Sequence, residues 1–130
     1  MKILLDTHVW LWLEVSPENL SSDALKLLSD TEHELILSAA STWEIAIKFA
    51  LGKLPLPMPP AKFALDSLAN NDFTPLFINH SHSLQVADLA RHHNDPFDRL
   101  LIAQAQLDDL TILTADKQFS AYDVKTYAAT

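Results

Sequence analysis

The sequence predicts a three-layer α/β/α fold around a central, mainly parallel sheet of four to five strands. Short, continuously apolar runs bounded by polar residues are typical of strands that are buried on both faces. Stretches with a helical spacing of apolar residues lie between these runs, so that strand and helix alternate along the 130 residues. This alternation favours right-handed crossovers on a parallel sheet flanked by helices. The length fits one domain, which we expect to span residues 1–130.

Each expected strand is a short apolar run that polar residues interrupt. In chain order the expected strands are Lys2–Leu5, Leu35–Leu37, Leu76–Ile78, Leu110–Leu113 and Val124–Thr126. The first run ends where Asp6 interrupts it. The residues after Tyr122 form either a short edge strand or a loose end, which leaves the number of strands at four or five.

The expected helices are the longer stretches in which apolar residues recur with a helical period. They are Leu20–Leu28, Ala39–Leu51, Ala61–Leu68, Leu84–Ala90 and Phe97–Leu107. Residues 54–60 hold four of the seven prolines. Because proline has no amide hydrogen to donate, we expect this segment to be a loop between two helices.

Composition and charge exclude several classes of function. Apolar residues make up 48% of the chain and charged residues 20%, which is enough apolar mass for a buried core. The net charge of -8 argues against non-specific coating of duplex nucleic acid, which needs many Lys and Arg contacts to phosphate. The absence of cysteine excludes disulfides, thiolate zinc sites, iron–sulfur clusters and cysteine nucleophiles.

The first residues and the glycine content exclude further devices. Asp6 interrupts the N-terminal apolar stretch, so we expect neither a signal peptide nor a membrane span there, no membrane partner, and a cytoplasmic location. The chain has one glycine, Gly52. The dinucleotide fingerprint and the P-loop both need several glycines, so nucleotide binding by these motifs is excluded.

Two aspartates follow expected strands. Asp6 comes directly after the first strand, and Asp116 lies just after the strand that ends at Leu113. Ligands of open parallel sheets bind at the carboxyl ends of the strands, so both carboxylates map to the edge where a site is expected. Helix capping is the alternative for each of them, because Asp is a preferred N-cap residue.

Glu44 lies near the start of the helix that follows the second strand. A surface pair with Lys48, four residues later, is one interpretation and would contribute only about 0.2–0.5 kcal/mol. However, Trp43 and the apolar residues 45–47 leave little room for a solvated stripe. We therefore expect Glu44 to point into a cleft.

Asp95 and Asp98 lie at the opening of the last helix. Asp95 precedes Pro96, which is typical of an N-cap followed by proline at the first helical position. Asp98 falls in the first turn, where the helix dipole stabilises a carboxylate by about 0.3–1 kcal/mol. The rest of this helix is almost wholly apolar, which indicates burial, and a buried carboxylate is costly unless it is paired or binds a metal.

Four acids can thus meet at one end of one sheet: Asp6, Glu44, Asp98 and Asp116. Without a counter-charge they would repel one another and raise their own pKa values. Oxygen ligands without thiolates favour Mg²⁺, with Mn²⁺ as the alternative, over zinc. Such a site predicts metal-assisted hydrolysis of phosphodiester bonds, with one or two ions.

Four motifs resemble those of PIN-domain ribonucleases, and more closely those of VapC-type toxins of bacterial toxin–antitoxin pairs. In order, the motifs are Leu4-Leu-Asp-Thr-His-Val-Trp10, Ser41-Thr-Trp-Glu-Ile-Ala-Ile-Lys48 with Leu51-Gly-Lys-Leu54, Asp95-Pro-Phe-Asp-Arg-Leu-Leu-Ile-Ala-Gln-Ala105 and Leu113-Thr-Ala-Asp-Lys117. Together they cover nearly the whole chain. The resemblance implies a PIN-like fold and a Mg²⁺-dependent endoribonuclease that acts on RNA.

The resemblance also implies roles for individual residues. Asp6 and Asp98 would be direct metal ligands, and Glu44 and Asp116 would complete the shell or orient metal-bound water. Hydroxyl residues of the family match Thr7 and Thr114, which would act only behind the ligands. The candidates for phosphate contact are Arg99, Lys48, Lys117, His92 and His93, and ordinary surface charge or pairing with the acids is the alternative for each.

Partners follow from the same resemblance. It implies a cognate antitoxin whose tail occupies the cleft, with an arginine drawn to the acids, and it implies a homodimer. Trp10, Trp12 and Trp43 are expected in the core or at the dimer interface rather than in catalysis. His8 is expected to pack or to form a local hydrogen bond.

Two other functions stay open at this point. A receiver-like Mg²⁺-binding signalling domain would share the acidic pocket and a late Thr and Lys, as Thr114 and Lys117. It also needs an aspartate at the end of a central strand, whereas the expected strand Leu76–Ile78 is followed by Asn79. The third class is a catalytically silent module that uses the pocket only to bind a partner.

Overall fold

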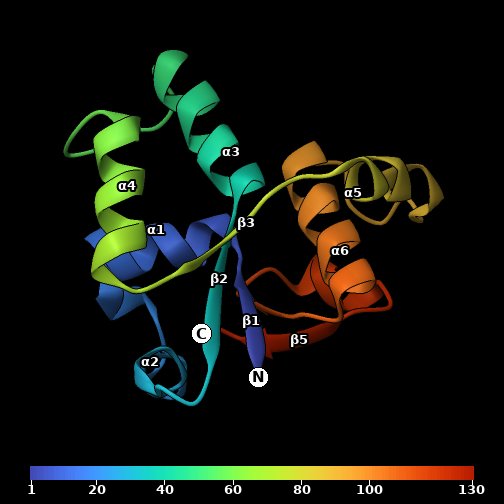
Figure 1. Cartoon of the computed structure of the whole chain (residues 1–130), viewed down its shortest axis with the longest axis horizontal. Coiled ribbons are helices and arrows are strands. Elements are labelled where there is room, and N and C mark those ends of the chain that lie inside the picture. Colours follow the sequence, from blue (N-terminus) through green and yellow to red (C-terminus); the bar gives the residue numbers. More distant parts are fainter.

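A computed structural model describes residues 1–130 and shows a five-stranded sheet between two layers of helices (Figure 1). The strand order is β3-β2-β1-β4-β5, and every neighbouring pair is parallel. The strands are β1 (Lys2–Leu5), β2 (Glu34–Ser38), β3 (Thr74–Leu76), β4 (Thr111–Thr114) and β5 (Lys125–Ala128). The predicted fold class is confirmed.

Helices connect successive strands. The α-helices are α1 (Thr7–Val15), α2 (Ser22–Ser29), α3 (Ala39–Ala50), α4 (Pro60–Asn70), α5 (His80–Gln85) and α6 (Pro96–Asp108). Short 3₁₀ helices lie at Pro17–Asn19, Val86–Asp88 and Lys117–Ala121. The proline-rich segment 54–60 forms the connection between α3 and α4, as predicted, and ends where α4 begins at Pro60.

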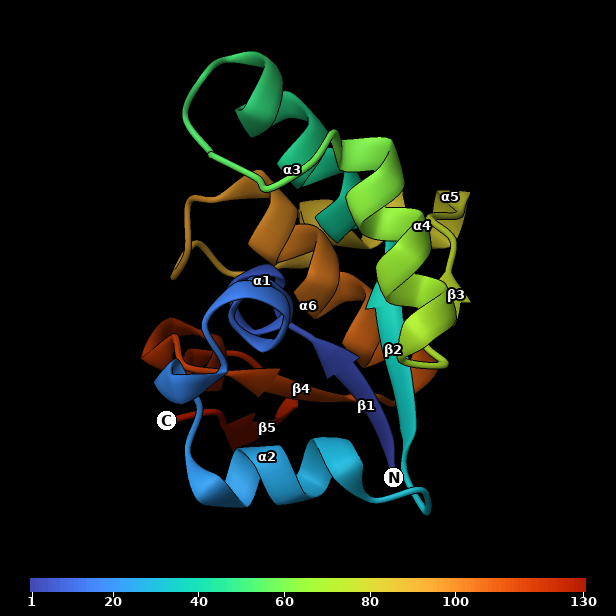
Figure 2. The same cartoon turned by 90° about the vertical axis from the view of Figure 1, so that its left-hand side faces the viewer.

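Alternate residues of the central strands face two separate cores. Ile3 and Leu5 of β1 belong to a core with the buried residues of α1, α2 and α4, whereas Leu4 belongs to a core built mainly by α6. This alternation follows from the two-residue period of a strand. In Figure 1, α1, α2 and α4 lie on one side of the sheet and α5 and α6 on the other. Figure 2 shows α3 rising beyond the carboxyl end of β2.

The strand order separates this fold from that of receiver domains. The order here is β3-β2-β1-β4-β5, whereas the flavodoxin-like order of receivers is 2-1-3-4-5. In addition, β3 lies at an edge of the sheet and ends at Leu76, whereas a receiver domain has an aspartate at the end of a central strand. The fold therefore contradicts the receiver-like alternative.

Some element boundaries differ from the prediction. Helix α1 is the helix that the capping alternative for Asp6 implied, but its bounds were not predicted, because its apolar residues surround the helix axis and leave no clear stripe. The third strand lies at Thr74–Leu76 rather than Leu76–Ile78, since an edge strand with exposed residues carries no buried apolar run. The expected helix Leu84–Ala90 is replaced by α5 and the 3₁₀ turn after it, because a capping box at Asn79 starts the helix earlier.

None of the helices has the length and apolar character needed to cross a bilayer.

Candidate functional site

The carboxyl ends of β1 and β4 lie side by side and place two of the predicted acids. Leu5 of β1 pairs with Leu113 of β4, and the amide of Asp6 donates a 3.0 Å hydrogen bond to the carbonyl of Leu113. Asp6 therefore lies next to Thr114, the last residue of β4, and Asp116 follows two residues later. The register of two parallel strands thus brings together residues from opposite ends of the chain.

Asp6 occupies the N-cap position of α1, but its side chain makes no capping hydrogen bond. Its Oδ2 instead accepts a 2.7 Å hydrogen bond from the hydroxyl of Thr114, and its Oδ1 is buried without a hydrogen-bond partner. Burial raises the pKa of Asp6, the hydrogen bond from Thr114 opposes this shift, and the charge of Glu44 adds to it. Capping does not account for this side chain.

Glu44 lies in α3 with its side chain buried, 3% of the residue being exposed. Its Oε2 accepts a hydrogen bond from Lys48, and its Oε1 is buried without a partner. Burial alone would lower the pKa of Lys48, but the hydrogen bond and charge of Glu44 outweigh this effect and raise it. The pair with Lys48 and the inward orientation, which the sequence posed as alternatives, therefore coexist.

Asp95 and Asp98 have different roles at the start of α6. Oδ1 of Asp95 accepts from the amides of Phe97, at 2.8 Å, and Asp98, at 3.1 Å, so the predicted N-cap is confirmed. Asp98 is left out of the capping. Burial raises the pKa of Asp98 to about 8, and the charges of Asp6, Asp95, Glu44 and Asp116 contribute to this rise. The charges of all three other predicted site acids thus contribute to the raised pKa of Asp98.

Asp116 both caps a helix and faces the site. Its Oδ1 accepts from the amide of Gln118 at 2.9 Å, which caps the 3₁₀ helix Lys117–Ala121. Its Oδ2 lies 3.0 Å from Nε2 of His93, and the same nitrogen lies 3.1 Å from Oδ2 of Asp98. For His93 the structure shows the alternative to phosphate contact, a pairing with the acids, and the two acids concerned are Asp98 and Asp116.

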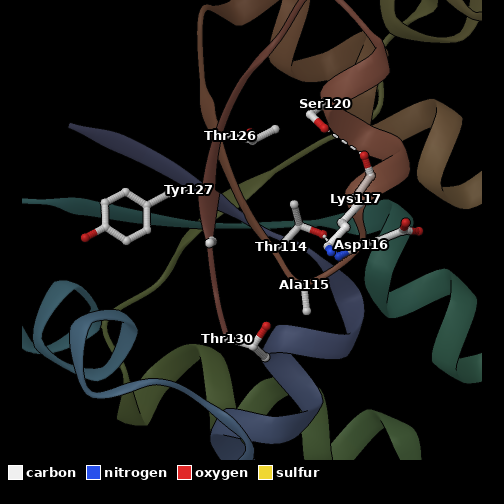
Figure 3. Close-up of a pocket in the computed structure, with 9 residues that line it drawn as sticks. Thr114, Ala115, Asp116, Lys117, Ser120, Thr126, Tyr127 and Thr130 are labelled. Carbon is white, nitrogen blue, oxygen red and sulfur yellow. Dashed lines mark hydrogen bonds between the residues drawn. The ribbon is translucent and has the colours of Figure 1, made fainter.

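A groove and a pocket adjoin the acids. The groove, about 250 Å³ in volume, is lined by Asp6, His8, Trp12, Ala115 and Asp116. His8, which we expected to pack or to form a local hydrogen bond, is exposed on its wall, with its ring 6.4 Å from the ring of Trp12. The pocket, about 210 Å³, lies between β5 and the 3₁₀ helix after β4, and its lining includes Thr114, Asp116, Lys117, Ser120 and Thr126. Figure 3 shows the carboxylate of Asp116 directed away from Thr126 and Tyr127.

The remaining residues that the sequence singled out make contacts away from the four acids or at the edge of the site. Arg99 donates to the carbonyls of residues 86, 89, 90 and 93 and thereby binds the loop before α6. His92 packs its ring against Tyr122 at 5.2 Å. Trp10 lies in the core as predicted, whereas Trp43 is 53% exposed and contacts Phe97 edge-on.

The side chains at this site fit a divalent cation. Two buried carboxylate oxygens, Asp6 Oδ1 and Glu44 Oε1, have no hydrogen-bond donor, and such atoms are costly in a protein interior. Burial raises the pKa of Asp98, and the neighbouring like charges add to this rise. A cation would compensate the negative charge, and oxygen ligands suit Mg²⁺ or Mn²⁺. The ligand atoms that lie within 4.8 Å of one another are those of His93, Asp98 and Asp116.

Comparison with known proteins gives a consistent result. The sequence matches the PIN-domain family over residues 3–125. It is 40% identical over 68 residues to Ribonuclease VapC16 of Mycobacterium tuberculosis, a match that covers 49% of this chain and 48%, or about half, of that relative.

Solved structures share the fold at low sequence identity. VapBC2 from Rickettsia felis, bound to a DNA fragment from its promoter, matches with a TM-score of 0.74 at 12% identity over 100% of both chains. VapBC-1 from nontypeable Haemophilus influenzae matches with a TM-score of 0.70 at 17% identity over 98% of both chains.

Proposed function

The chain belongs to the PIN-domain family, and we propose that it is a Mg²⁺-dependent endoribonuclease, the toxin of a toxin–antitoxin pair. In this proposal it hydrolyses RNA phosphodiester bonds at the site formed by Asp6, Glu44, Asp98 and Asp116. The likeness to Ribonuclease VapC16 supports the reaction class, although the match spans about half of that relative.

One observation carries the proposal: four carboxylates from four separate elements converge, and two of their buried oxygens lack a partner. Native proteins leave few buried polar atoms without a partner, because each unsatisfied group lowers stability. A site that binds a cation is expected to have them. Mg²⁺, or Mn²⁺ in its place, fits oxygen ligands that leave room for water and substrate.

The acids differ in how many of their carboxylate oxygens have hydrogen-bond partners in the protein. Both oxygens of Asp116 have protein partners, and Glu44 uses Oε2 for Lys48. Asp6 keeps Oδ1 and Glu44 keeps Oε1 without a partner, so the division of roles between these two follows the family resemblance. We assign direct metal binding to Asp6 and Asp98, and completion of the shell to Glu44 and Asp116. When bound, the ion supplies an activated water and neutralises charge that develops on the phosphate and the leaving oxygen.

The residues behind the acids hold them in place. Thr114 donates to Asp6 and accepts, at 2.9 Å, from the amide of Asp116. Lys48 holds one oxygen of Glu44, so that the other is directed elsewhere. Thr7 shares a 2.8 Å hydrogen bond with Ser41, which joins α1 to α3 beside the site. These contacts fix the carboxylates before the substrate arrives, which is the preorganisation that catalysis requires.

We assign the RNA backbone to the pocket beside Asp116. A chain with a net charge of -8 has few cations to offer a phosphate. Lys48 pairs with Glu44 and Arg99 donates to backbone carbonyls, whereas Lys117 takes part in none of the ion pairs of the structure. Lys117 lines the pocket together with the hydroxyl residues Ser120 and Thr126. A phosphate next to the scissile bond would find the ammonium group of Lys117 and the hydroxyl of Thr126 there, whereas the hydroxyl of Ser120 donates to the carbonyl of Lys117.

The proposed protein partners are a cognate antitoxin and a second copy of the chain, in the cytoplasm. The VapBC names of the structural neighbours support an antitoxin. Trp43 is exposed beside the buried Glu44, and its ring contacts Phe97 at 5.0 Å, which gives an apolar surface next to the acids. We expect an antitoxin tail to bind near this surface and to bring an arginine to the carboxylates. Purified antitoxin should then abolish cleavage.

The decisive test is RNA cleavage with and without Mg²⁺ by the unaltered chain and by Asp6→Asn and Asp98→Asn. Each variant should lose cleavage by orders of magnitude while keeping its fold, because a metal ligand loses its charge. Asp88→Asn changes an exposed carboxylate in a 3₁₀ helix and should cleave normally. Cleavage that persists in both site variants refutes the assignment. Partner binding without any cleavage would favour the silent binding module instead.

A further inference from the structure

His93 lies between two of the site acids and is almost fully buried. Its Nε2 is 3.0 Å from Oδ2 of Asp116 and 3.1 Å from Oδ2 of Asp98, and its side chain is 10% exposed. The two aspartates come from different elements, one from the first turn of α6 and one from the loop after β4. His93 is therefore the side chain that joins these two carboxylates.

The other ring nitrogen determines which chemistry His93 can offer. Nδ1 accepts a 3.1 Å hydrogen bond from the backbone amide of Asp95. An accepting Nδ1 carries no proton, so the imidazole carries its proton on Nε2. A protonated Nε2 is a hydrogen-bond donor and has no lone pair for a metal ion. The amide of Asp95 thus makes His93 a donor toward the two acids.

The surroundings hold the ring and its loop in one orientation. The imidazole stacks on the buried ring of Phe119, with centroids 5.8 Å apart and an interplanar angle of 30°. The amide of His93 donates to the hydroxyl of Tyr122 at 2.8 Å, and its carbonyl accepts from Arg99 at 3.3 Å. Phe119 thus holds the ring of His93, and Tyr122 and Arg99 hold its backbone.

We propose that His93 is a positioning residue of the site, which donates from Nε2 to Asp98 and Asp116 and binds no metal itself. This inference rests on the proposed function, because the acids matter only if they hold an ion. The donor binds Oδ2 of both carboxylates and draws together two groups that otherwise repel each other. Partners of this kind behind metal ligands typically change metal affinity about 10- to 100-fold when they are removed.

The competing role for His93 is direct metal binding, and nitrogen NMR of the imidazole separates the two. We expect the ring proton to lie on Nε2 and not on Nδ1, both without metal and after saturation with Mg²⁺. A proton on Nδ1 in either state overturns the inference. Loss of the proton from Nε2 on addition of Mg²⁺ would identify a ligand instead and also overturn it. This measurement needs no enzymatic activity.

Substitutions test the positioning role through Mn²⁺ affinity, measured by calorimetry. His93→Leu removes the donor and should weaken Mn²⁺ binding about 10- to 100-fold. His93→Gln keeps an N–H donor at a similar reach and should restore most of that affinity. His92→Leu changes the neighbouring exposed histidine, which contacts Tyr122 rather than the acids, and should bind as the unaltered chain does.

The outcomes for the two proposals are distinct. If the unaltered chain binds no divalent ion, the proposed function fails. If it binds Mn²⁺ and His93→Leu binds equally well, the positioning role of His93 fails while the proposed function stands. If His93→Leu does not fold, the comparison of His93→Gln with the unaltered chain and the NMR measurement still decide the question.

Discussion

Thr114 and Asp6 lie 108 residues apart in the sequence, and the hydroxyl of Thr114 donates a 2.7 Å hydrogen bond to Oδ2 of Asp6. The same hydroxyl accepts from the amide of Asp116, so its own proton is directed at Asp6. This contact exists because β1 and β4 are parallel neighbours in the centre of the sheet. One threonine therefore links an acid near the start of the chain to one near its end.

Replacement of Thr114 tests this link. Thr114→Val keeps the shape of the side chain but leaves Oδ2 of Asp6 and the amide of Asp116 without partners. Hydrogen bonds to charged groups contribute about 1.5–3 kcal/mol, so we expect a comparable loss in the free energy of unfolding at pH 8, measured with urea. Thr114→Ser retains the hydroxyl and should lose much less. Equal stability of the two variants would contradict the role of the hydroxyl.

The raised pKa of Asp98 predicts how stability depends on pH. A carboxyl group whose pKa is higher in the folded chain binds more protons when folded, so stability falls as pH rises between the unfolded and folded values. For Asp98 this interval runs from the ordinary value of 3.8 to about 8. Within it the group lowers the free energy of unfolding by up to about 1.4 kcal/mol per pH unit. The raised pKa of Asp6 acts in the same direction.

Asp98→Asn isolates this contribution, because asparagine stays neutral at every pH. Urea unfolding with EDTA should show the variant gaining stability relative to the unaltered chain between pH 5 and pH 8. A stability difference that is the same at both pH values would show that Asp98 has an ordinary pKa.

Metal binding at pH 7 should release protons. Because the pKa of Asp98 is about 8, this carboxyl is mostly protonated at pH 7 and must lose its proton to bind a cation. Calorimetric titration with Mn²⁺ in two buffers of different ionisation enthalpy should therefore report nearly one proton released from Asp98. The Asp98→Asn variant should release correspondingly fewer. Equal release from both chains would place the displaced proton elsewhere.

Lys117→Ala tests the assignment of the RNA backbone to the pocket beside Asp116. Loss of one phosphate contact should raise KM for RNA and leave kcat nearly unchanged. It should also reduce the slope of log affinity against log salt by about one. Lys125→Ala is the matched control. It removes the same charge from the first residue of β5, whose ammonium group pairs with Asp109. Equal effects of the two variants would indicate non-specific attraction.

Local patterns were sufficient for much of the fold. The buried strands β1, β2 and β4 stand out as apolar runs, and the Asp-Pro pair at residues 95 and 96 marks the start of α6. The edge strand β3 lies at Thr74–Leu76 rather than at the predicted Leu76–Ile78, and the bounds of helix α1 were not predicted. An edge strand buries few side chains, and α1 is apolar on most sides, so neither has the periodic contrast on which such predictions depend.

The amino-acid sequence alone determined the α/β/α class, the parallel sheet and the identity of four acids near its carboxyl edge, because burial and capping leave local signals. The tertiary structure decided how each acid is used. Asp95 caps α6, and Asp116 caps the 3₁₀ helix after β4 and also faces the site. Asp6 lies at the N-cap of α1, but its side chain makes no capping hydrogen bond. It also brought His93 between two aspartates. These choices depend on strand register and on contacts between distant residues, which no short stretch of sequence contains.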